Sequence, residues 1–193
     1  MKTSRVPQHP VQDFIIDRWS PRALSGESLQ DSELMSLFEA ARWAPSSYNN
    51  QPWRFIYAKR ETEHWERLFG LLSAWNQAWT KNAAVLVVVL SKKIFDYNGK
   101  ESKTHRFDTG AAWENLALEA SARGLIAHGM EGFDYDAARQ TLGVPEEYDV
   151  EAMIAIGKPG RKEDLSEELQ KIETPSDRRP LGEIIMEGLF HER

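Results

Sequence analysis

Apolar and polar positions along the chain repeat at two different periods. Within 33–43, four apolar residues follow helical spacing: Leu34, Leu37, Phe38 and Ala41. This spacing predicts a helix with one buried face, whereas residues 53–58 (WRFIYA) alternate as a strand does. The run AAVLVVVL at 83–90 is apolar throughout but much shorter than the roughly 20 residues that span a membrane. It therefore predicts a strand covered on both faces.

The same patterns predict the remaining elements. Helices are expected at 61–75, 108–123 and 135–142, and further strands at 84–91, 125–130 and 150–156. Strands and helices alternate without an even βα period, so the predicted fold class is α+β, with a small sheet and several helices. We expect a single domain over 1–193, with a loose N-terminal arm at 1–12, a charged linker or solvated helix at 160–177 and a C-terminal tail at 178–193.

Composition and charge exclude several classes of protein. Lys and Arg number 24 against 30 Asp and Glu, and the net charge of −6 argues against a general nucleic-acid binder. The chain has no Cys, which rules out disulfides, thiolate metal sites and iron–sulfur clusters. The 5 His show no metal-ligand spacing, so no metal site is expected. Without a signal-peptide pattern or membrane span, a cytoplasmic location is expected.

Motifs of nucleophilic and dinucleotide chemistry are missing from the sequence. It contains no G-x-G-x-x-G, no P-loop and no G-x-S-x-G. A phosphate-binding group does stand out at 18–22, because the guanidiniums of Arg18 and Arg22 and the hydroxyl of Ser20 match phosphate oxygens. A surface ion pair with a neighbouring acid explains the two arginines about equally well when they are taken alone.

Three further polar groups have a simpler explanation when each is taken separately. A loop between two prolines offers Ser46, Ser47 and Asn49 at short reach, although turn residues after a helix have the same composition. Gly132, after Glu131, lets a ligand approach the backbone, or marks an ordinary turn. Arg178 and Arg179 follow a long charged stretch, where a solvated basic pair is the alternative.

Taken together, these segments resemble the nitroreductase family of flavin enzymes. The most specific match is A-P-S-S-x-N-x-Q-P-W at 44–53, and the R-x-S-x-[RK] group at 18–22 precedes it. Asn76 before the buried strand, the turn at 131–134 and the Gly-Lys-Pro at 157–159 follow in order. The resemblance covers nearly the whole chain. It implies a nitroreductase-like fold, a mostly antiparallel sheet flanked by helices, and an intertwined homodimer with FMN at the subunit interface.

The resemblance also implies roles for particular residues. Arg18, Ser20 and Arg178 would hold the FMN phosphate, with main-chain contact from Trp19 and with Arg179 as an additional candidate. Arg22 and Asn76 would lie at the pyrimidine edge of the flavin, and Glu131 and Gly132 near its N5 atom. Ser46, Ser47 and Asn49 would reach the flavin from the other subunit. No catalytic side chain is needed, because the flavin carries the redox chemistry.

The function that the resemblance implies is an FMN-dependent oxidoreductase. NADH or NADPH would reduce the flavin and leave, and a nitroaromatic, quinone or similar electron-poor acceptor would then bind and be reduced. One alternative is a flavoenzyme of the same fold with another reaction, such as dehalogenation or flavin destruction. Another is a non-enzymatic FMN carrier, or a Trp-rich module for flat ligands, since Trp is abundant at 7 residues.

Overall fold

A four-stranded antiparallel sheet forms the centre of the computed structural model, which describes residues 2–190. The strands are β1 (Trp53–Lys59), β2 (Val85–Lys92), β3 (Ile126–Met130) and β4 (Tyr148–Gly157). Their order is β1-β2-β4-β3, and every neighbouring pair is antiparallel. The predicted α+β class and antiparallel sheet are therefore confirmed.

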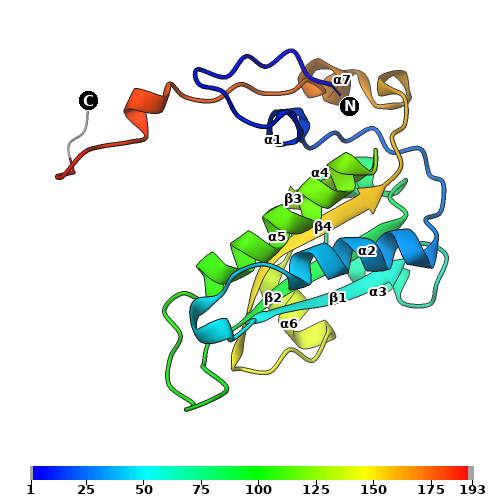
Figure 1. Cartoon of the computed structure of the whole chain (residues 1–193). Coiled ribbons are helices and arrows are strands. Elements are labelled where there is room, and N and C mark those ends of the chain that lie inside the picture. Colours follow the sequence, from blue (N-terminus) through cyan, green and yellow to red (C-terminus); the bar gives the residue numbers. More distant parts are fainter. Residues whose placement is uncertain (1, 191–193) are drawn as a thin grey trace.

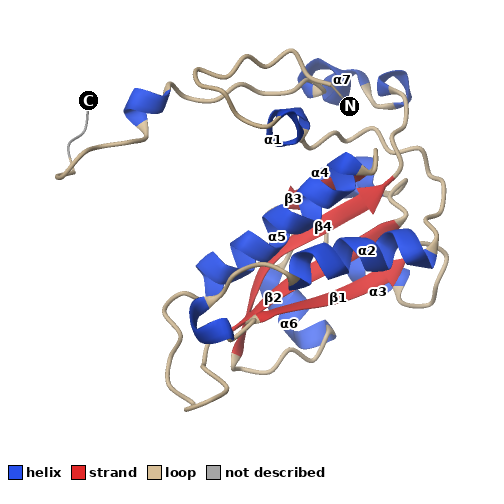
Figure 2. Cartoon of the chain, viewed as in Figure 1, coloured by secondary structure: helices blue, strands red, loops and turns tan. Residues whose placement is uncertain are grey.

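Helices cover both faces of this sheet (Figure 2). Helices α2 (Asp31–Arg42) and α5 (His105–Ala122) pack together on one face, where their apolar residues join a buried cluster that includes Val85, Val87 and Val89. Three shorter helices contribute to a second cluster on the other face: α3 (Trp65–Phe69), α4 (Ala74–Thr80) and α6 (Tyr135–Thr141). The sheet is thus the middle of three layers.

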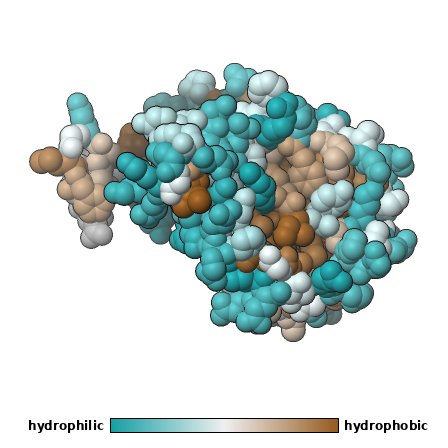
Figure 3. Space-filling model, turned by 90° about the horizontal axis from the view of Figure 1, so that it is seen from below, coloured by the Kyte–Doolittle hydropathy of each residue, from teal (hydrophilic) through white to brown (hydrophobic). Residues whose placement is uncertain are grey.

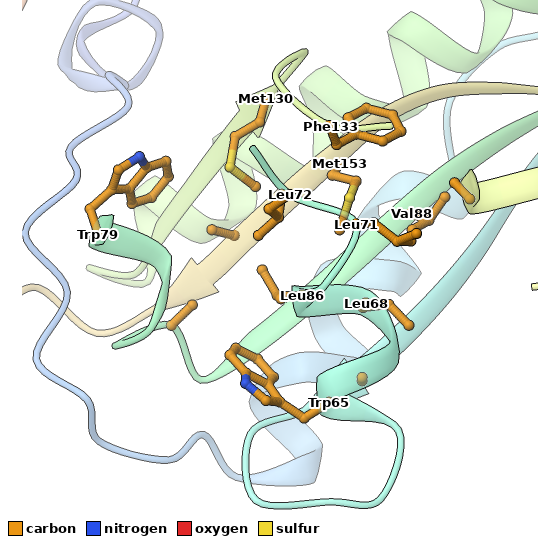
Figure 4. Close-up of a cluster of buried hydrophobic side chains, with 14 of the residues drawn as sticks. Trp65, Leu68, Leu71, Leu72, Trp79, Leu86, Val88, Met130, Phe133 and Met153 are labelled. Atoms are coloured by element: carbon orange, nitrogen blue, oxygen red, sulfur yellow. The ribbon is translucent and has the colours of Figure 1, made fainter. Parts of the chain in front are cut away.

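Strand β2 divides its side chains between the two cores, as its continuously apolar sequence predicts. Leu86, Val88 and Leu90 belong to the cluster drawn in Figure 4, and the alternate valines face the helices α2 and α5. The side chains of Leu86, Val88 and Leu90 are at most 4% exposed. A strand with no polar face can lie only inside a sheet that is covered on both sides.

The prediction of a single helix at 61–75 is wrong, because α3 ends at Phe69 and a second helix, α4, begins at Ala74. Between α3 and α4, Leu72 pairs as an isolated bridge with Phe133, which pulls the backbone out of helical geometry. Ser73 then starts α4 as its N-cap, its hydroxyl accepting from the Asn76 N–H at 3.4 Å. As a result Asn76, expected in an irregular stretch, lies inside a helix.

The tryptophans, expected to pack in the core apart from Trp19 and Trp53, divide into two groups. Trp65 and Trp79 are buried and Trp113 packs half-buried against the cluster of α2 and α5, whereas Trp43 is 71% exposed and Trp75 is 44% exposed. Packing was therefore the wrong prediction for Trp43 and Trp75. Trp43 caps the end of α2, where its ring lies under the Arg42 guanidinium and its Nε1–H donates to Glu39.

The two terminal segments run side by side above the sheet (Figure 1). The Arg5 Nε–H donates to the Ser176 carbonyl oxygen at 2.7 Å, and the Leu181 N–H donates to the Gln8 side chain at 2.7 Å. A short helix α1 (Asp13–Asp17) follows the N-terminal segment, and α7 (Glu167–Ile172) lies in the stretch expected to be a linker or solvated helix. Met1 and residues 191–193 of the expected arm and tail lie outside the described residues.

The surface is polar over most of the face in Figure 3, with apolar side chains gathered near its middle and on the projecting C-terminal segment. The exposed apolar residues of that segment are Leu181, Ile184, Ile185, Leu189 and Phe190. None of the helices in the described range is long and apolar enough to cross a membrane.

Candidate functional site

A cationic hollow of about 260 Å³ lies where the two terminal segments meet the segment 18–22. Four arginines line it, and no acidic residue is among its described lining residues: Arg5, Arg18, Trp19, Ser20, Arg22, His128, Ile172, Thr174, Ser176 and Arg178. In a chain with a net charge of −6, this gathering of guanidiniums forms surroundings that suit an anion. The structure thus brings together Arg18, Ser20 and Arg178, as the sequence predicts.

Arg5 is a member of this hollow that the sequence analysis missed. Its guanidinium is held by three carbonyl oxygens, those of Ile16, Arg18 and Ser176, at 2.7–3.1 Å. Burial and then the charges of Arg178 and Arg18 lower the pKa of Arg5 from its usual value. Burial is the larger cause of this shift, and the charge of Asp177 opposes it. Arg5 stands alone in an unpatterned arm, so no sequence signal marks it.

The other three arginines are each oriented by a neighbour. An Nη1–H of Arg18 donates to the Ser20 hydroxyl at 3.3 Å, and its Nε lies 3.7 Å from Glu114 of α5. Arg22 forms an ion pair at 3.8 Å with Glu173, a buried carboxylate that also accepts from the backbone N–H groups of residues 22 and 23. Arg178 curls back on its own segment through Ser176.

A second hollow of about 580 Å³ shares Arg18 and Ser20 with the first and follows strand β3. Glu131 lies in its lining, together with Trp113, Gly129 and Met130. Gly129 lets the Trp113 ring lie close to the strand, because a Cβ at this position would lie a tight 3.2 Å from that ring. The flat indole and the backbone of β3 offer a planar ring system one aromatic wall, while Glu114, Glu131 and Glu151 make the rest of the lining polar.

A chain of contacts links the cationic hollow to the turn after β3. The Nδ1–H of His128 donates to the Pro21 carbonyl oxygen at 3.0 Å, and its ring lies 4.6 Å from the Trp79 ring. The Trp79 Nε1–H donates to Asn76 Oδ1 at 3.3 Å, and Asn76 Nδ2 donates to the Gly132 carbonyl oxygen at 2.9 Å. Asn76 therefore holds the Gly132 carbonyl group, and it is itself buried and lines neither hollow. We call this series the His128–Gly132 chain.

His128 is the member of this chain whose charge state matters. Burial lowers the pKa of His128 from 6.5 to about 4, and the charges of Arg22 and Arg18 add to the shift against the hydrogen bonds to the backbone at Pro21 and Ser20. The imidazole is therefore neutral at pH 7. His128 lies on strand β3. A lone histidine in an apolar strand gives no sequence signal, so its position beside the phosphate-binding group could not be predicted.

We expect His128 to make the folded state less stable as the pH falls from about 6.5 to about 4. In this window the unfolded chain binds a proton on His128 that the folded chain does not, so the free energy of unfolding falls with the pH; above about 6.5 this contribution is constant. Urea unfolding at several pH values should show that the free energy of unfolding falls less between pH 6.5 and pH 4 in His128→Gln than in the parent chain. Equal slopes in the two proteins would contradict the buried neutral imidazole.

The proline-bounded loop lies in another part of the molecule. It forms a 3-10 turn at Ser47–Asn49 just before β1, far from α1 in Figure 1, and none of Ser46, Ser47 and Asn49 lines either of the two hollows. The Ser47 N–H donates to the buried Asp108 of α5 at 3.0 Å, and the Ser46 hydroxyl accepts from the Gln51 N–H at 3.0 Å. Asn76, Gly132 and Arg179 line neither hollow as well, so within one chain the expected flavin ligands do not all converge.

A group of possible metal ligands lies near the end of β2. Among the described residues, His105, Asp149 and Glu151 place ligand atoms within 4.8 Å of one another. Arg106 pairs with both carboxylates, and Lys93 pairs with Asp149. These cations already compensate the acidic charge that would attract a divalent ion, so the group carries no metal proposal.

Comparison with known proteins identifies the fold. A model of the nitroreductase family matches residues 15–158, about three quarters of the chain. The chain belongs to the nitroreductase family. The matched range includes the segment 18–22, the proline-bounded loop and both ends of the His128–Gly132 chain, and the resemblance to the nitroreductase family is confirmed.

Solved members and curated relatives of the nitroreductase family resemble this chain along most of its length. A crystal structure described as an oxidoreductase containing FMN is 41% identical, with a TM-score of 0.95, and covers 100% of this chain and 99% of its own. A Desulfovibrio desulfuricans nitroreductase family structure in complex with FMN is 27% identical, with a TM-score of 0.73, over 96% and 100% of the two chains. An Archaeoglobus fulgidus protein named "Putative NADH dehydrogenase/NAD(P)H nitroreductase" is 28% identical over 161 residues, 80% of this chain and 88% of its own.

The residues of this nitroreductase-family chain fit the cofactor that those two structures contain. FMN combines a phosphate with a flat ring, and the two hollows that share Arg18 and Ser20 offer a matching pair of surroundings. The smaller hollow supplies guanidiniums for a dianion, and the larger one supplies an indole wall beside β3. Arg5, which the sequence did not mark, adds a further guanidinium to the lining of the smaller hollow.

Proposed function

We propose that this chain is an FMN-dependent oxidoreductase. It takes electrons from NADH or NADPH and passes them to nitroaromatic, quinone or similar electron-poor acceptors. The observation that carries the proposal is the convergence of Arg5, Arg18 and Arg178 on one hollow with no acid in its lining. The FMN in two related structures and the name of the Archaeoglobus fulgidus relative support the cofactor and the nicotinamide.

In this proposal the phosphate is held by Arg18, Ser20 and Arg178, with Arg5 supporting them. Trp19 contributes main-chain contact beside Arg18. We assign the late arginine role to Arg178 and not to Arg179, because only Arg178 lines the hollow. A guanidinium binds two phosphate oxygens at once, so this end anchors the cofactor.

The residues around the ring would orient it and set its electronic environment. FMN, when bound, supplies the group that accepts and donates the hydride. The family resemblance assigns Arg22 and Asn76 to the pyrimidine edge, where a cation and an amide donor favour added negative charge. In this chain Arg22 lines the smaller hollow, and Asn76 lines neither of the two. Glu131 and Gly132 lie at the other end of the chain of contacts, where the Gly132 backbone is fixed by Asn76 and Ser73. A Cβ at Gly132 would lie 2.7 Å from Asn76 Nδ2, so the turn must be glycine to keep this arrangement.

We also propose that two copies of the chain share each flavin. Ser46, Ser47 and Asn49 line neither hollow of their own chain, and a second copy would bring them to the ring. The exposed apolar residues of the C-terminal segment, such as Ile184 and Phe190, would be covered in such a dimer. Light scattering tests this, since a monomer that retains FMN would contradict the shared site. The cytoplasmic location expected from the sequence stays a prediction.

The absorption spectrum of the protein tests the proposed function. After incubation with FMN and gel filtration, the chain should retain one flavin and its visible absorption. Anaerobic NADH or NADPH should bleach this absorption, and menadione or nitrobenzene should restore it. A colourless protein would contradict the proposal, bound flavin without NAD(P)H oxidation would indicate a carrier, and stoichiometric flavin loss or halide release would indicate another reaction of the same fold.

A further inference from the structure

An exposed aromatic cluster lies beside the proline-bounded loop. Tyr48 of the loop meets Phe95 and Tyr97 from the segment after β2, with ring centroids 5.4–5.6 Å apart for all three pairs. Tyr48 is 78% exposed and Tyr97 is 61% exposed, so the cluster is not part of a core. We call these three rings the aromatic platform.

Two kinds of contact fix the platform to the protein. Asn50 ties the loop to the neighbouring segment, because its side chain accepts from the Asp96 N–H at 2.9 Å and donates to the Ile94 carbonyl oxygen at 3.2 Å. That segment is closed as a hairpin by the pairing of Ile94 with Glu101. The rings are therefore presented by a rigid support, although they lie in loops.

The backbone under Tyr48 adopts a conformation that tyrosine seldom takes. Tyr48, Asn49 and Gln51 have φ values of 51°, 52° and 47°, in the left-handed region that favours glycine. The hydrogen bonds to Asp108 and within the loop hold these residues in place. This backbone conformation does not bury the Tyr48 ring, which stays exposed. Backbone strain of this kind is concentrated at functional sites.

A hollow of about 350 Å³ opens beside the platform. Its lining combines the Tyr48 and Tyr97 rings with Asn49, Gln51 and Arg54. Asn49 is a residue that the proposed function places at the flavin of the partner chain. Tyr48 directly precedes Asn49, so the hollow would open next to that ring.

We propose that the aromatic platform selects acceptors by stacking on planar aromatic rings. The proposal rests on the proposed function, since it places the platform beside the flavin through Ser47 and Asn49. Two tyrosines and a phenylalanine with tilted and edge-on ring pairs offer several faces and edges to a flat molecule. Planar aromatic acceptors are thus bound at the flavin more tightly than compact non-aromatic ones.

The test compares Tyr97→Leu and Tyr48→Asn with a matched control. Leucine keeps an apolar side chain at an exposed position, and asparagine tolerates the left-handed backbone of residue 48. Tyr57→Leu removes an equivalent ring from β1, where Tyr57 packs against Phe38. With NADH as reductant, kcat/KM should fall about 3- to 10-fold for menadione in the two platform variants, mainly through KM. The kcat/KM for ferricyanide should stay unchanged in both platform variants. The kcat/KM for menadione should stay unchanged in Tyr57→Leu.

A binding measurement separates the platform from the reaction. Nitrobenzene titrated into the oxidised, FMN-loaded protein should perturb the flavin spectrum with a Kd about 3- to 10-fold higher in Tyr97→Leu. If Tyr97→Leu retains full flavin content and NADH oxidation but binds nitrobenzene with an unchanged Kd, the role of the platform is contradicted and the proposed function is not. Failure to retain FMN would overturn the proposed function and the platform with it. If light scattering gives Tyr97→Leu a different molecular mass from the parent protein, a second copy covers these rings. That result also contradicts the role of the platform.

Discussion

Replacing Arg18 with Gln is expected to weaken FMN binding about 10- to 100-fold. The Arg18 guanidinium lines both hollows, and its loss removes a charge-assisted hydrogen bond worth about 1.5–3 kcal/mol. The variant also leaves Glu114, 3.7 Å from Arg18 Nε, without its cation near the bound phosphate. Flavin fluorescence titration of the apo-protein measures this Kd. The remaining arginines should keep binding detectable.

Riboflavin is the control that makes this prediction specific. It has the ring of FMN without the phosphate, so its affinity should be nearly the same in Arg18→Gln and the parent chain. Arg161→Gln is a matched surface variant, since Arg161 is 78% exposed, pairs with Asp164 and lines neither hollow. FMN and riboflavin losing affinity equally in Arg18→Gln would show that the substitution disturbs the ring site and not a phosphate anchor.

The features that followed from the sequence are those decided by neighbours along the chain. The apolar run of β2 and the periodic face of α2 required burial wherever the chain placed them, and both are buried. The phosphate-binding group at 18–22 was visible because three of its members lie within five residues. Local spacing is enough in these cases, because the physical requirement acts over one or two turns of chain.

The features that the sequence did not reveal depend on contacts between distant segments. Arg5 joins the hollow only because the N-terminal segment lies against Ser176. The helix at 61–75 divides because Leu72 pairs with Phe133, about sixty residues later. Ser46 and Arg18 carry equally clear motifs, yet the chain leaves them in different places. No pattern within a window of the sequence can report these long-range placements.

Trp75 and Trp79 show the same limit within one helix. Both were expected to pack, and they are four residues apart on α4, but Trp79 is 2% exposed and Trp75 is 44% exposed. Trp79 is drawn among the buried side chains of Figure 4. Its Nε1–H also holds Asn76, so this residue serves both the core and the site.

We therefore expect Trp79→Ala to lower the free energy of unfolding by about 3–5 kcal/mol, because it empties a fully buried indole site. For a chain of this size the midpoint of thermal unfolding should fall by about 6–20 °C. Trp75→Ala is the matched control in the same helix and should change the unfolding free energy by less than about 1 kcal/mol. Similar losses in the two variants, measured by urea unfolding, would contradict the burial difference.

Trp79→Phe separates packing from the link to the site. Phenylalanine fills most of the indole volume but cannot donate to Asn76 Oδ1, so the buried amide loses a partner at a cost of about 1–3 kcal/mol. Asn76 is then free to turn away from Gly132, the glycine whose backbone it fixes from 2.9 Å. We expect riboflavin affinity to fall together with FMN affinity in this variant, in contrast to Arg18→Gln. Unchanged riboflavin binding in Trp79→Phe would mean that Asn76 keeps the turn in place without the indole, and that the His128–Gly132 chain does not position the ring.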